Sequence, residues 1–462
     1  MKQCSWALIL LLSLSMRGMG AEKVDWVIHA RYILTMDPEH RIIENGAIAI
    51  KDGHIAAVDK QRVVDADFTS DNILEKSNSL LAPGLIDTHT HAPMVLLRGI
   101  ADDRKLEDWL HNYIFPAEAR NVSPDFVRWG TRLACLEMLL AGITTYTDMY
   151  YFEENEAQAA KEIGIRAVLG QTIIGFPAPD YKTWQEAIAG TERFLKRYQH
   201  DDLIVPAVAP HAIYTTPDSA LVASHKLASQ YGAPLLIHLA ETSTERDEAM
   251  SKRAQTPTQV LENLGLLEGR VVAAHSIWED DRDLQILRRH NTGVAHCPSS
   301  NMKLADGVAH ISQMLKLGIH VGLGTDGFAG SNDSADLMRE MDIAAKLQKI
   351  TQLDPSALPA EQVLDMATIG GARVLGLDRE TGSLEKGKRA DLFSLSLTST
   401  HAKPLYDLYS FVVYAARSNE VEDVFVNGRE LIRNREPLTI DQGTVFQKAM
   451  QYQQQIQASL KH

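Results

Sequence analysis

The sequence is short of cysteine, of basic charge and, beyond its first residues, of long apolar runs. It has 3 cysteines among 462 residues, and the later two, Cys135 and Cys297, cannot form the disulfide framework of a small secreted scaffold. The formal net charge of -14 argues against nucleic acid as a partner, because a phosphate backbone is bound by a basic face. No later stretch reaches about 18 uncharged apolar residues, so we expect no membrane anchor in the processed chain.

Residues 1–21 have a composition of their own. Lys2 precedes the apolar run 6–14, and small residues then lead to Ala21. This order is typical of a secretory signal peptide, and the run is too short to span a membrane. Arg17 and Met19 are unusual so close to a cleavage site. We expect cleavage near Ala21 and a periplasmic or secreted protein.

The two ends of the remaining chain share a pattern of short strands with Gly, Asp and Asn between them. The expected strands are residues 24–30, 32–36, 46–50, 54–59, 421–426 and 430–432. Neither end alone is large enough for a stable sheet core. We therefore expect residues 22–80 and 383–445 to form one small β-sandwich, with residues 446–462 as a C-terminal helix or tail.

Between these ends, residues 81–382 alternate between strand-like and helix-like stretches. Eight strands are expected, at residues 80–91, 143–149, 166–173, 203–211, 234–241, 271–275, 292–297 and 320–326. The clearest helix is 124–140, with Ser123 as its cap and Gly142 just after its end. Such alternation predicts an α/β fold, a (β/α)8 barrel of the TIM type.

Polar residues collect where these strands end. They are His89, His91, Asp148, His211, His238, Glu241, His275, His296 and Asp326. Barrel strands are otherwise buried on both faces, and barrel active sites are built at the carboxyl ends of the strands. The pattern therefore predicts a catalytic site at this end.

Individual positions indicate a metal. His89 and His91 are two apart on a strand and face the same side, where imidazole nitrogens suit Zn²⁺ or Fe²⁺. His238 follows an apolar run, and Glu241 lies three residues later, where it can shuttle protons. Asp326, between glycines, can bind a metal or accept a proton. Each feature alone also has a structural interpretation, a buried histidine with a hydrogen bond or an aspartate in a turn.

Together these residues resemble the amidohydrolase superfamily over about residues 22–440. More narrowly, the chain resembles the 5-methylthioadenosine/S-adenosylhomocysteine deaminases and the triazine chlorohydrolases. The supporting stretches are residues 115–120, 209–211, 296–301 and 323–327. From the residues alone, Glu118 would be interpreted as a solvent-exposed carboxylate.

The resemblance implies a role for each matching residue. His89, His91, His238 and Asp326 would bind one divalent metal, with zinc the first expectation and iron the alternative. Glu241, His275 and Asp326 would be catalytic groups that move protons. Glu118, His211 and Glu241 would contact the substrate, with Glu118 at ribose hydroxyls. A single metal is expected because residues 203–211 lack the lysine or glutamate that bridges two metals in binuclear members.

The implied activity is hydrolytic deamination of a purine-like or other aminated N-heterocycle, such as a 5-methylthioadenosine or adenosine nucleoside, with release of ammonia. The alternatives are a chlorohydrolase, a cyclic amidohydrolase or a non-catalytic scaffold. Deaminases of S-adenosylhomocysteine resemble one another in having arginines after the third strand, whereas residues 171–184 here contain only Lys182 as a basic residue. The expected partner is a small molecule, and homo-oligomer formation stays open.

Overall fold

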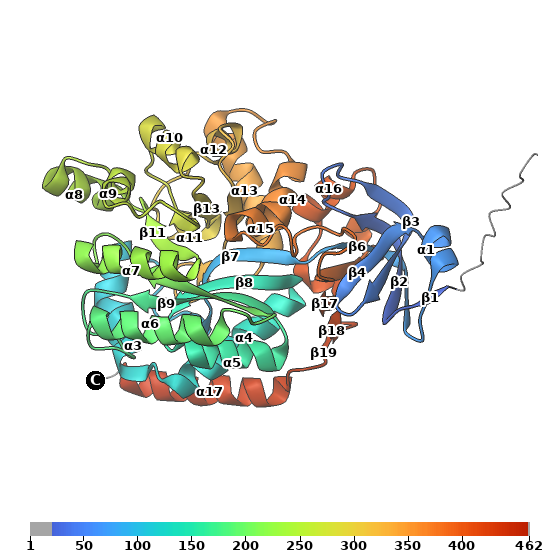
Figure 1. Cartoon of the computed structure of the whole chain (residues 1–462), viewed down its shortest axis with the longest axis horizontal. Helices are drawn as coiled ribbons and strands as arrows, with labels where there is room; N and C mark the ends of the chain where they lie inside the picture. Colours follow the sequence, from blue (N-terminus) through green and yellow to red (C-terminus); the bar gives the residue numbers. More distant parts are fainter. Residues whose placement is uncertain (1–20, 461–462) are drawn as a thin grey trace, which may run out of the picture.

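The computed structural model describes residues 21–460 (Figure 1). The expected signal peptide lies outside the described residues except for Ala21, so it stays a prediction. Among residues 21–460, no helix combines the length and apolar character needed to cross a membrane.

The centre of the molecule is a curled parallel sheet of nine strands in the order β14-β13-β12-β11-β10-β9-β8-β7-β15. Its strands are β7 (Leu85–His91), β8 (Ile143–Tyr150), β9 (Arg166–Ile173), β10 (Ile204–Pro210), β11 (Leu235–Leu239), β12 (Val271–His275), β13 (Gly293–His296), β14 (Val321–Leu323) and β15 (Asp326–Gly327). All eight expected strands are found. β14 pairs with β13 and β15 pairs with β7, so residues 321–327 connect the two edges of the sheet.

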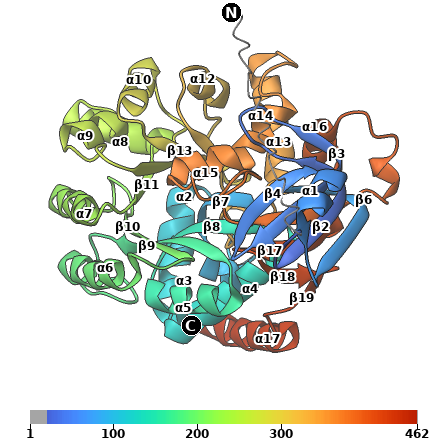
Figure 2. The same cartoon turned by 45° about the vertical axis from the view of Figure 1, so that its right-hand side comes forward.

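Helices surround this sheet (Figure 2). They are α4 (Pro124–Leu140), α5 (Glu153–Ile163), α6 (Trp184–Tyr198), α7 (Asp218–Tyr231), α8 (Ser243–Arg253), α9 (Pro257–Asn263), α10 (Asp281–Arg289), α11 (Pro298–Lys303), α12 (Ile311–Lys316), α13 (Leu337–Gln352), α14 (Ala360–Ala367) and α15 (Ile369–Leu375). The expected helix 124–140 is confirmed as α4, and its cap is the Ser123 side chain, which accepts from the Phe126 amide. The apolar faces of these helices bury the outer face of the sheet.

The chain ends build a second sheet, at one side of the molecule in Figure 1. Its order is β19-β18-β17-β16-β6-β2-β3-β4. The strands are β2 (Trp26–Leu34), β3 (Ile42–Lys51), β4 (His54–Lys60), β6 (Ile73–Pro83), β16 (Leu392–Ser396), β17 (Val421–Val426), β18 (Arg429–Arg433) and β19 (Glu436–Pro437). β6 and β16 pair directly, so strands from both ends of the chain join in one continuous eight-stranded sheet. One strand, β2, replaces the two expected over residues 24–36, and the short pair β1 (Glu22–Lys23) and β5 (Phe68–Thr69) flanks α1 (Gln61–Asp67).

The expected strand 80–91 is in fact shared between the two sheets. β6 ends at Pro83 and β7 begins at Leu85. Gly84 lies between them, and a Cβ there would clash with the Thr144 side chain, so the crossing requires glycine. The buried Arg166 side chain pairs with Asp391 at 2.8 Å and holds the two sheets together. Pro83 and Gly84 interrupt the apolar run in the sequence, but the apolar residues on both sides do not show that the two halves join different sheets.

Short elements cover the carboxyl end of the barrel between β7 and α4. They are η1 (Ala92–Leu97), α2 (Leu106–Asp108), the π-helix η2 (Trp109–Ile114) and α3 (Phe115–Asn121); we call residues 92–121 the wall segment. Trp109 Nε1 donates to the Ala329 carbonyl at 2.7 Å and fixes this segment to the loop after β15.

Further short elements are η3 (Thr400–Ala402), α16 (Leu408–Ser410), η4 (Phe411–Ala415) and η5 (Ser418–Glu420).

The C-terminal helix α17 (Gln442–Ser459) begins before the expected boundary at residue 446 and runs along the base of the molecule in Figure 1. It packs against α4 and α3. The helix therefore connects the end of the chain to the wall segment.

Candidate metal centre and substrate pocket

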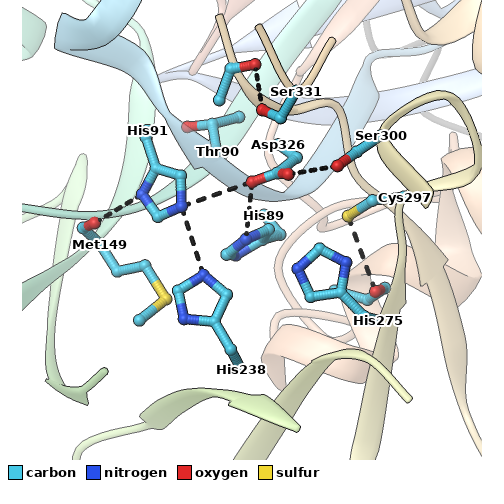
Figure 3. Close-up of polar contacts among 12 residues, drawn as sticks. His89, Thr90, His91, Met149, His238, His275, Cys297, Ser300, Asp326 and Ser331 are labelled. Carbon is cyan, nitrogen blue, oxygen red and sulfur yellow. Dashed lines mark hydrogen bonds and ion pairs between the residues drawn. The ribbon is translucent and has the colours of Figure 1, made fainter. Parts of the chain in front are cut away.

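Five side chains that are far apart in the sequence meet at the carboxyl ends of the strands. They are His89, His91, His238, His275 and Asp326, which we call the histidine–aspartate cluster (Figure 3). Asp326 Oδ1 lies 3.2 Å from His89 Nε2 and 3.4 Å from His91 Nε2. His238 Nε2 lies 3.3 Å from His91 Nε2. The structure thus brings together all four predicted metal ligands and the predicted catalytic histidine.

The donor atoms of this cluster fit a divalent metal ion. His89, His238, His275 and Asp326 each offer one atom, and these four atoms lie within 4.8 Å of one another. Within residues 21–460, the buried Nε2 atoms of His89 and His275 have no hydrogen-bond partner. An unpaired buried nitrogen is costly, and a metal ion held here would satisfy that of His89. Imidazole nitrogens with a carboxylate oxygen are a donor set that suits zinc or iron.

Backbone carbonyl groups on the side away from the cluster orient two of the histidine rings. His91 Nδ1 lies 2.8 Å from the Met149 carbonyl oxygen, and His238 Nδ1 lies 2.8 Å from that of His211. Such partners fix a ring's tautomer and direct its Nε2 toward the centre. The barrel strands therefore supply both the donor groups and their supports.

The backbone around the cluster is strained. Asp326 has φ 61°, His275 has φ 70° and Ala240 has φ 49°, a left-handed region that non-glycine residues adopt at a cost. Asp87 holds the residue before Asp326, because its carboxylate accepts from Thr325 Oγ1 at 2.6 Å and from the Thr325 amide at 3.1 Å. The strain is therefore concentrated where strand ends turn their side chains toward one point.

The cluster opens into a pocket of about 550 Å³, including the part open to solvent. The wall segment supplies most of its apolar lining, namely Met94, Leu106, Trp109, Leu110, Ile114 and Phe115. Polar groups of the lining include His211, Glu118, Glu241 and Thr172. Among the described residues that form this lining there is no lysine or arginine. Lys182, the one basic residue of the stretch 171–184, does not line the pocket and donates to the Ala178 carbonyl. A pocket of this kind fits a small, largely uncharged molecule.

Glu118 lies on α3, buried at the pocket rather than in solvent. Tyr150 Oη donates to Glu118 Oε1 at 2.7 Å. Burial raises the pKa of Glu118 to about 7. The expectation that followed from the residues alone, a solvent-exposed carboxylate, is wrong because the wall segment folds α3 inward.

Glu241 follows β11, and its side chain lies beside His275 of the cluster. Its Oε1 lies 3.5 Å from His275 Nε2, and its amide donates to Glu245 Oε2 at 2.9 Å. Burial, with the nearby carboxylates of Asp326 and Glu245, raises the pKa of Glu241 well above its usual range. A carboxyl group that keeps its proton at neutral pH can serve as a general acid.

The other strand-end residues divide into two groups. His211 lines the pocket, with its ring centroid 4.7 Å from that of His238, and burial lowers its pKa to about 3, so the ring is neutral. Asp148 and His296 do not line the pocket. Asp148 Oδ1 instead accepts from Thr90 Oγ1 at 2.7 Å and from the Ala92 amide, on both sides of His91.

Sequence reasoning missed Tyr150 and Trp109 as parts of the pocket. Tyr150 could have been found from its place as the last residue of β8, because barrel active sites are built at the carboxyl ends of the strands. Trp109 carries no such signal, since its role depends on a π-helix and on the distant Ala329 carbonyl.

A barrel-like α/β fold whose strand ends gather histidines and an aspartate around one pocket defines a metal-dependent hydrolase. The family model described as "Amidohydrolase family" matches residues 80–431, and the chain belongs to this family. It is an enzyme that hydrolyses carbon–nitrogen bonds.

Known proteins resemble the chain over nearly its whole length. It is 45% identical over 436 residues to the 5-methylthioadenosine/S-adenosylhomocysteine deaminase of Thermodesulfovibrio yellowstonii, covering 94% of this chain and 99% of that protein. An adenosine deaminase structure from Xanthomonas campestris with bound zinc is 35% identical with a TM-score of 0.93, covering 95% of this chain and 100% of that one. Atrazine chlorohydrolase from Arthrobacter aurescens shares the fold, at 24% identity and a TM-score of 0.85 over 92% of this chain and 99% of that one.

Proposed function

We propose that the protein is a zinc-dependent aminohydrolase that replaces the amino group of a purine-type nucleoside by a carbonyl oxygen and releases ammonia. The observation that supports this proposal is that one pocket joins the histidine–aspartate cluster with Glu241, whose pKa is raised by burial, and with the buried Glu118. The names of the deaminases that resemble the chain support this reaction. Adenosine and 5-methylthioadenosine are the substrates we favour.

In this proposal, His89, His91, His238 and Asp326 hold one divalent metal. When bound, such a metal lowers the pKa of a water molecule toward about 7 and so supplies the nucleophile. Zinc is favoured over iron because the resembling adenosine deaminase holds zinc. A single ion is favoured because β10, Ile204–Pro210, contains no lysine or glutamate that could bridge a second one.

Three residues would move protons. Glu241 donates its proton to a ring nitrogen, which makes the adjacent carbon electrophilic. Asp326 and His275 accept a proton from the attacking water and orient it toward that carbon. The proton taken from the water then passes to the departing amino group, which leaves as ammonia, while the added hydroxyl becomes the carbonyl oxygen and its proton returns to Glu241. The 3.5 Å between Glu241 Oε1 and His275 Nε2 supports a shared path for these protons.

Glu118 would bind the sugar. A carboxylate that faces the pocket can accept hydrogen bonds from two neighbouring ribose hydroxyls, and Tyr150 keeps it in place. His211 would contact the base from the opposite side of the cluster. The apolar wall segment would pack against an uncharged 5′ substituent.

The test is a substrate panel with purified protein of measured zinc content. The panel contains adenosine, 5-methylthioadenosine, S-adenosylhomocysteine, a free aminopurine and a chlorotriazine, with ammonia and chloride both measured. We expect ammonia from the nucleosides and a higher kcat/KM for 5-methylthioadenosine than for S-adenosylhomocysteine. Chloride release without ammonia would instead establish a chlorohydrolase, and a zinc-loaded protein inactive on the whole panel would contradict the proposal.

We also propose two points about the whole chain. The first point concerns the fold. The curled sheet is a (β/α)8 barrel, and this is supported by residues 321–327, which connect its two edges. The chain-end sheet and the β1–β5 pair together form a small β-sandwich. The enzyme is secreted to the periplasm, which the run at residues 6–14 supports. Expression in a Gram-negative host should give periplasmic protein shortened near Ala21; full-length protein confined to the cytosol would contradict export.

A further inference from the structure

The short helix α11 contacts two members of the histidine–aspartate cluster through adjacent residues. Ser300 Oγ donates to Asp326 Oδ2 at 2.5 Å (Figure 3). Asn301 Oδ1 lies 2.9 Å from His275 Nδ1. Ser300 and Asn301 are 0% and 1% exposed, so water does not compete for these bonds. Neither side chain lines the pocket.

We propose that Ser300 and Asn301 are positioning residues, Ser300 for Asp326 and Asn301 for His275. Ser300 occupies Oδ2 of Asp326, so that Oδ1 is the oxygen that faces His89 and His91. Asn301 accepts the proton of His275 Nδ1, so that the lone pair of Nε2 faces the cluster and Glu241. The inference deepens the proposed function and rests on it for the roles of Asp326 and His275.

Each of these bonds holds the side-chain atom that faces away from the cluster. Within residues 21–460, Asp326 Oδ2 has no other hydrogen-bond partner than Ser300, and His275 Nδ1 has none other than Asn301. Both cluster residues also have the strained left-handed backbone described above. His275 is the last residue of β12 and Asp326 the first residue of β15, and in both cases the side-chain hydrogen bond comes from α11, outside the sheet.

The helix that carries the pair is itself fixed against the loop that carries Asp326. The buried Glu340 of α13 accepts from the Ser299 amide at 3.0 Å and from Asn332 Nδ2 at 3.0 Å. Asn332 Nδ2 also donates to the Thr325 carbonyl at 2.7 Å, one residue before Asp326. Glu340 therefore sets the distance between α11 and Asp326, so that Ser300 meets the carboxylate in one geometry.

The experiment compares Ser300→Ala and Asn301→Ala with the conservative Ser300→Thr and Asn301→Asp. Ser299→Ala is the matched control, because the Ser299 hydroxyl is on the same helix and, in the described chain, has no hydrogen-bond partner. Four quantities are measured on each purified variant: zinc affinity by competition with a chelator, the visible absorption of the cobalt-substituted protein, kcat and KM for 5-methylthioadenosine, and the melting temperature without metal.

Ser300→Ala should lower zinc affinity by about 10–100-fold, as loss of an outer partner of a metal ligand does, and lower kcat. Asn301→Ala should lower kcat by about 10–100-fold with KM within about twofold and should change the cobalt spectrum. Ser300→Thr and Asn301→Asp keep the hydroxyl and the acceptor oxygen and should recover most of each loss. Ser299→Ala should match the wild type in all four quantities.

Wild-type zinc affinity and cobalt spectrum in Ser300→Ala would overturn the role of Ser300. An unchanged kcat and spectrum in Asn301→Ala, or no recovery in Asn301→Asp, would overturn that of Asn301. Equal losses in Ser299→Ala would show general damage to α11 and would overturn both. If the wild type binds zinc but deaminates nothing, the proposed function fails, whereas the zinc affinities and cobalt spectra still decide these two roles.

Discussion

The pocket has two sides that are built by different means. On the strand side, the functional groups of the histidine–aspartate cluster project from barrel strands, and most have a second partner behind them, as His91 has Met149. On the other side, the wall segment consists of short 3-10, α and π helices that present apolar side chains such as Leu110 and Ile114. Under the proposed function, the strands would therefore hold the groups that carry out the reaction, and the connecting wall segment would determine which substrate fits.

The two sides also differ in charge. The strand side holds several buried ionisable groups, whereas Glu118 is the one charged residue of the described wall segment that lines the pocket. An acidic substituent on the substrate would face Glu118 and apolar side chains. The described lining contains no lysine or arginine that could pair with it. Burying an unpaired charge is costly. The comparison therefore predicts that changes on the strand side stop the reaction, while changes in the wall segment alter only which substrate binds.

The largest effect should come from removing a donor of the cluster. His238→Ala should lose most bound zinc and reduce activity to the assay background, because the remaining ligands hold the ion poorly. The loss of zinc affinity should exceed the roughly 10–100-fold cost of losing an outer partner. Metal analysis of dialysed protein measures it, with the exposed His200→Ala as control. Wild-type zinc content in His238→Ala would contradict the assignment.

Next in size is the loss of the general acid. Glu241→Gln keeps the shape of the side chain and removes its titratable proton. We expect kcat to fall by roughly 10²–10⁴-fold, the usual contribution of a general acid–base group, with zinc content near that of the wild type. Glu248→Gln, exposed on α8, is the matched control. Loss of zinc would instead make Glu241 a ligand, and retained turnover would move the proton transfer to His275.

A change in the wall segment should behave differently. Glu118→Gln should raise KM for adenosine by about 10–100-fold, since a hydrogen bond to a charged group contributes about 1.5–3 kcal/mol. It should leave kcat/KM for the free aminopurine within about twofold, because that substrate has no ribose. Parallel kinetics with both substrates measure the difference. Equal losses on both substrates would show that Glu118 acts on the chemistry, and the contrast between the two sides would not hold.

The same contrast explains what the sequence could predict. The grouping of residues on the strand side follows from the sequence pattern, because regular alternation places His89 and His238 in the last part of β7 and β11. The expected strand 320–326 is divided in the structure, so Asp326 begins β15. Glu118 was reached only through resemblance, since nothing in residues 115–121 shows that α3 turns inward. The sequence indicates that the two chain ends belong together and that Pro83 and Gly84 interrupt the run 80–91, but it does not show that β6 pairs directly with β16, because pairing between distant segments leaves no local periodicity.

The smallest effect should come from the far end of the chain, which supports the wall segment from outside. Asn121 of α3 donates through Nδ2 to Ser459 Oγ of α17 at 2.9 Å, and Arg120 Nη1 donates to the Ser459 carbonyl at 3.2 Å. Because α3 carries Glu118, loosening this contact should move the carboxylate proposed to bind ribose without touching the cluster.

Ser459→Ala removes the hydroxyl and leaves the carbonyl. A neutral hydrogen bond contributes about 0.5–1.5 kcal/mol, so KM for adenosine should rise by about two- to tenfold. kcat and zinc content should stay unchanged, because every donor of the cluster comes from the barrel. Gln454→Ala, exposed on the same helix, controls for a general effect on α17. A fall in kcat with constant KM would mean that α17 acts on the strand side, and the division between a catalytic side and a selective side would then have to be abandoned.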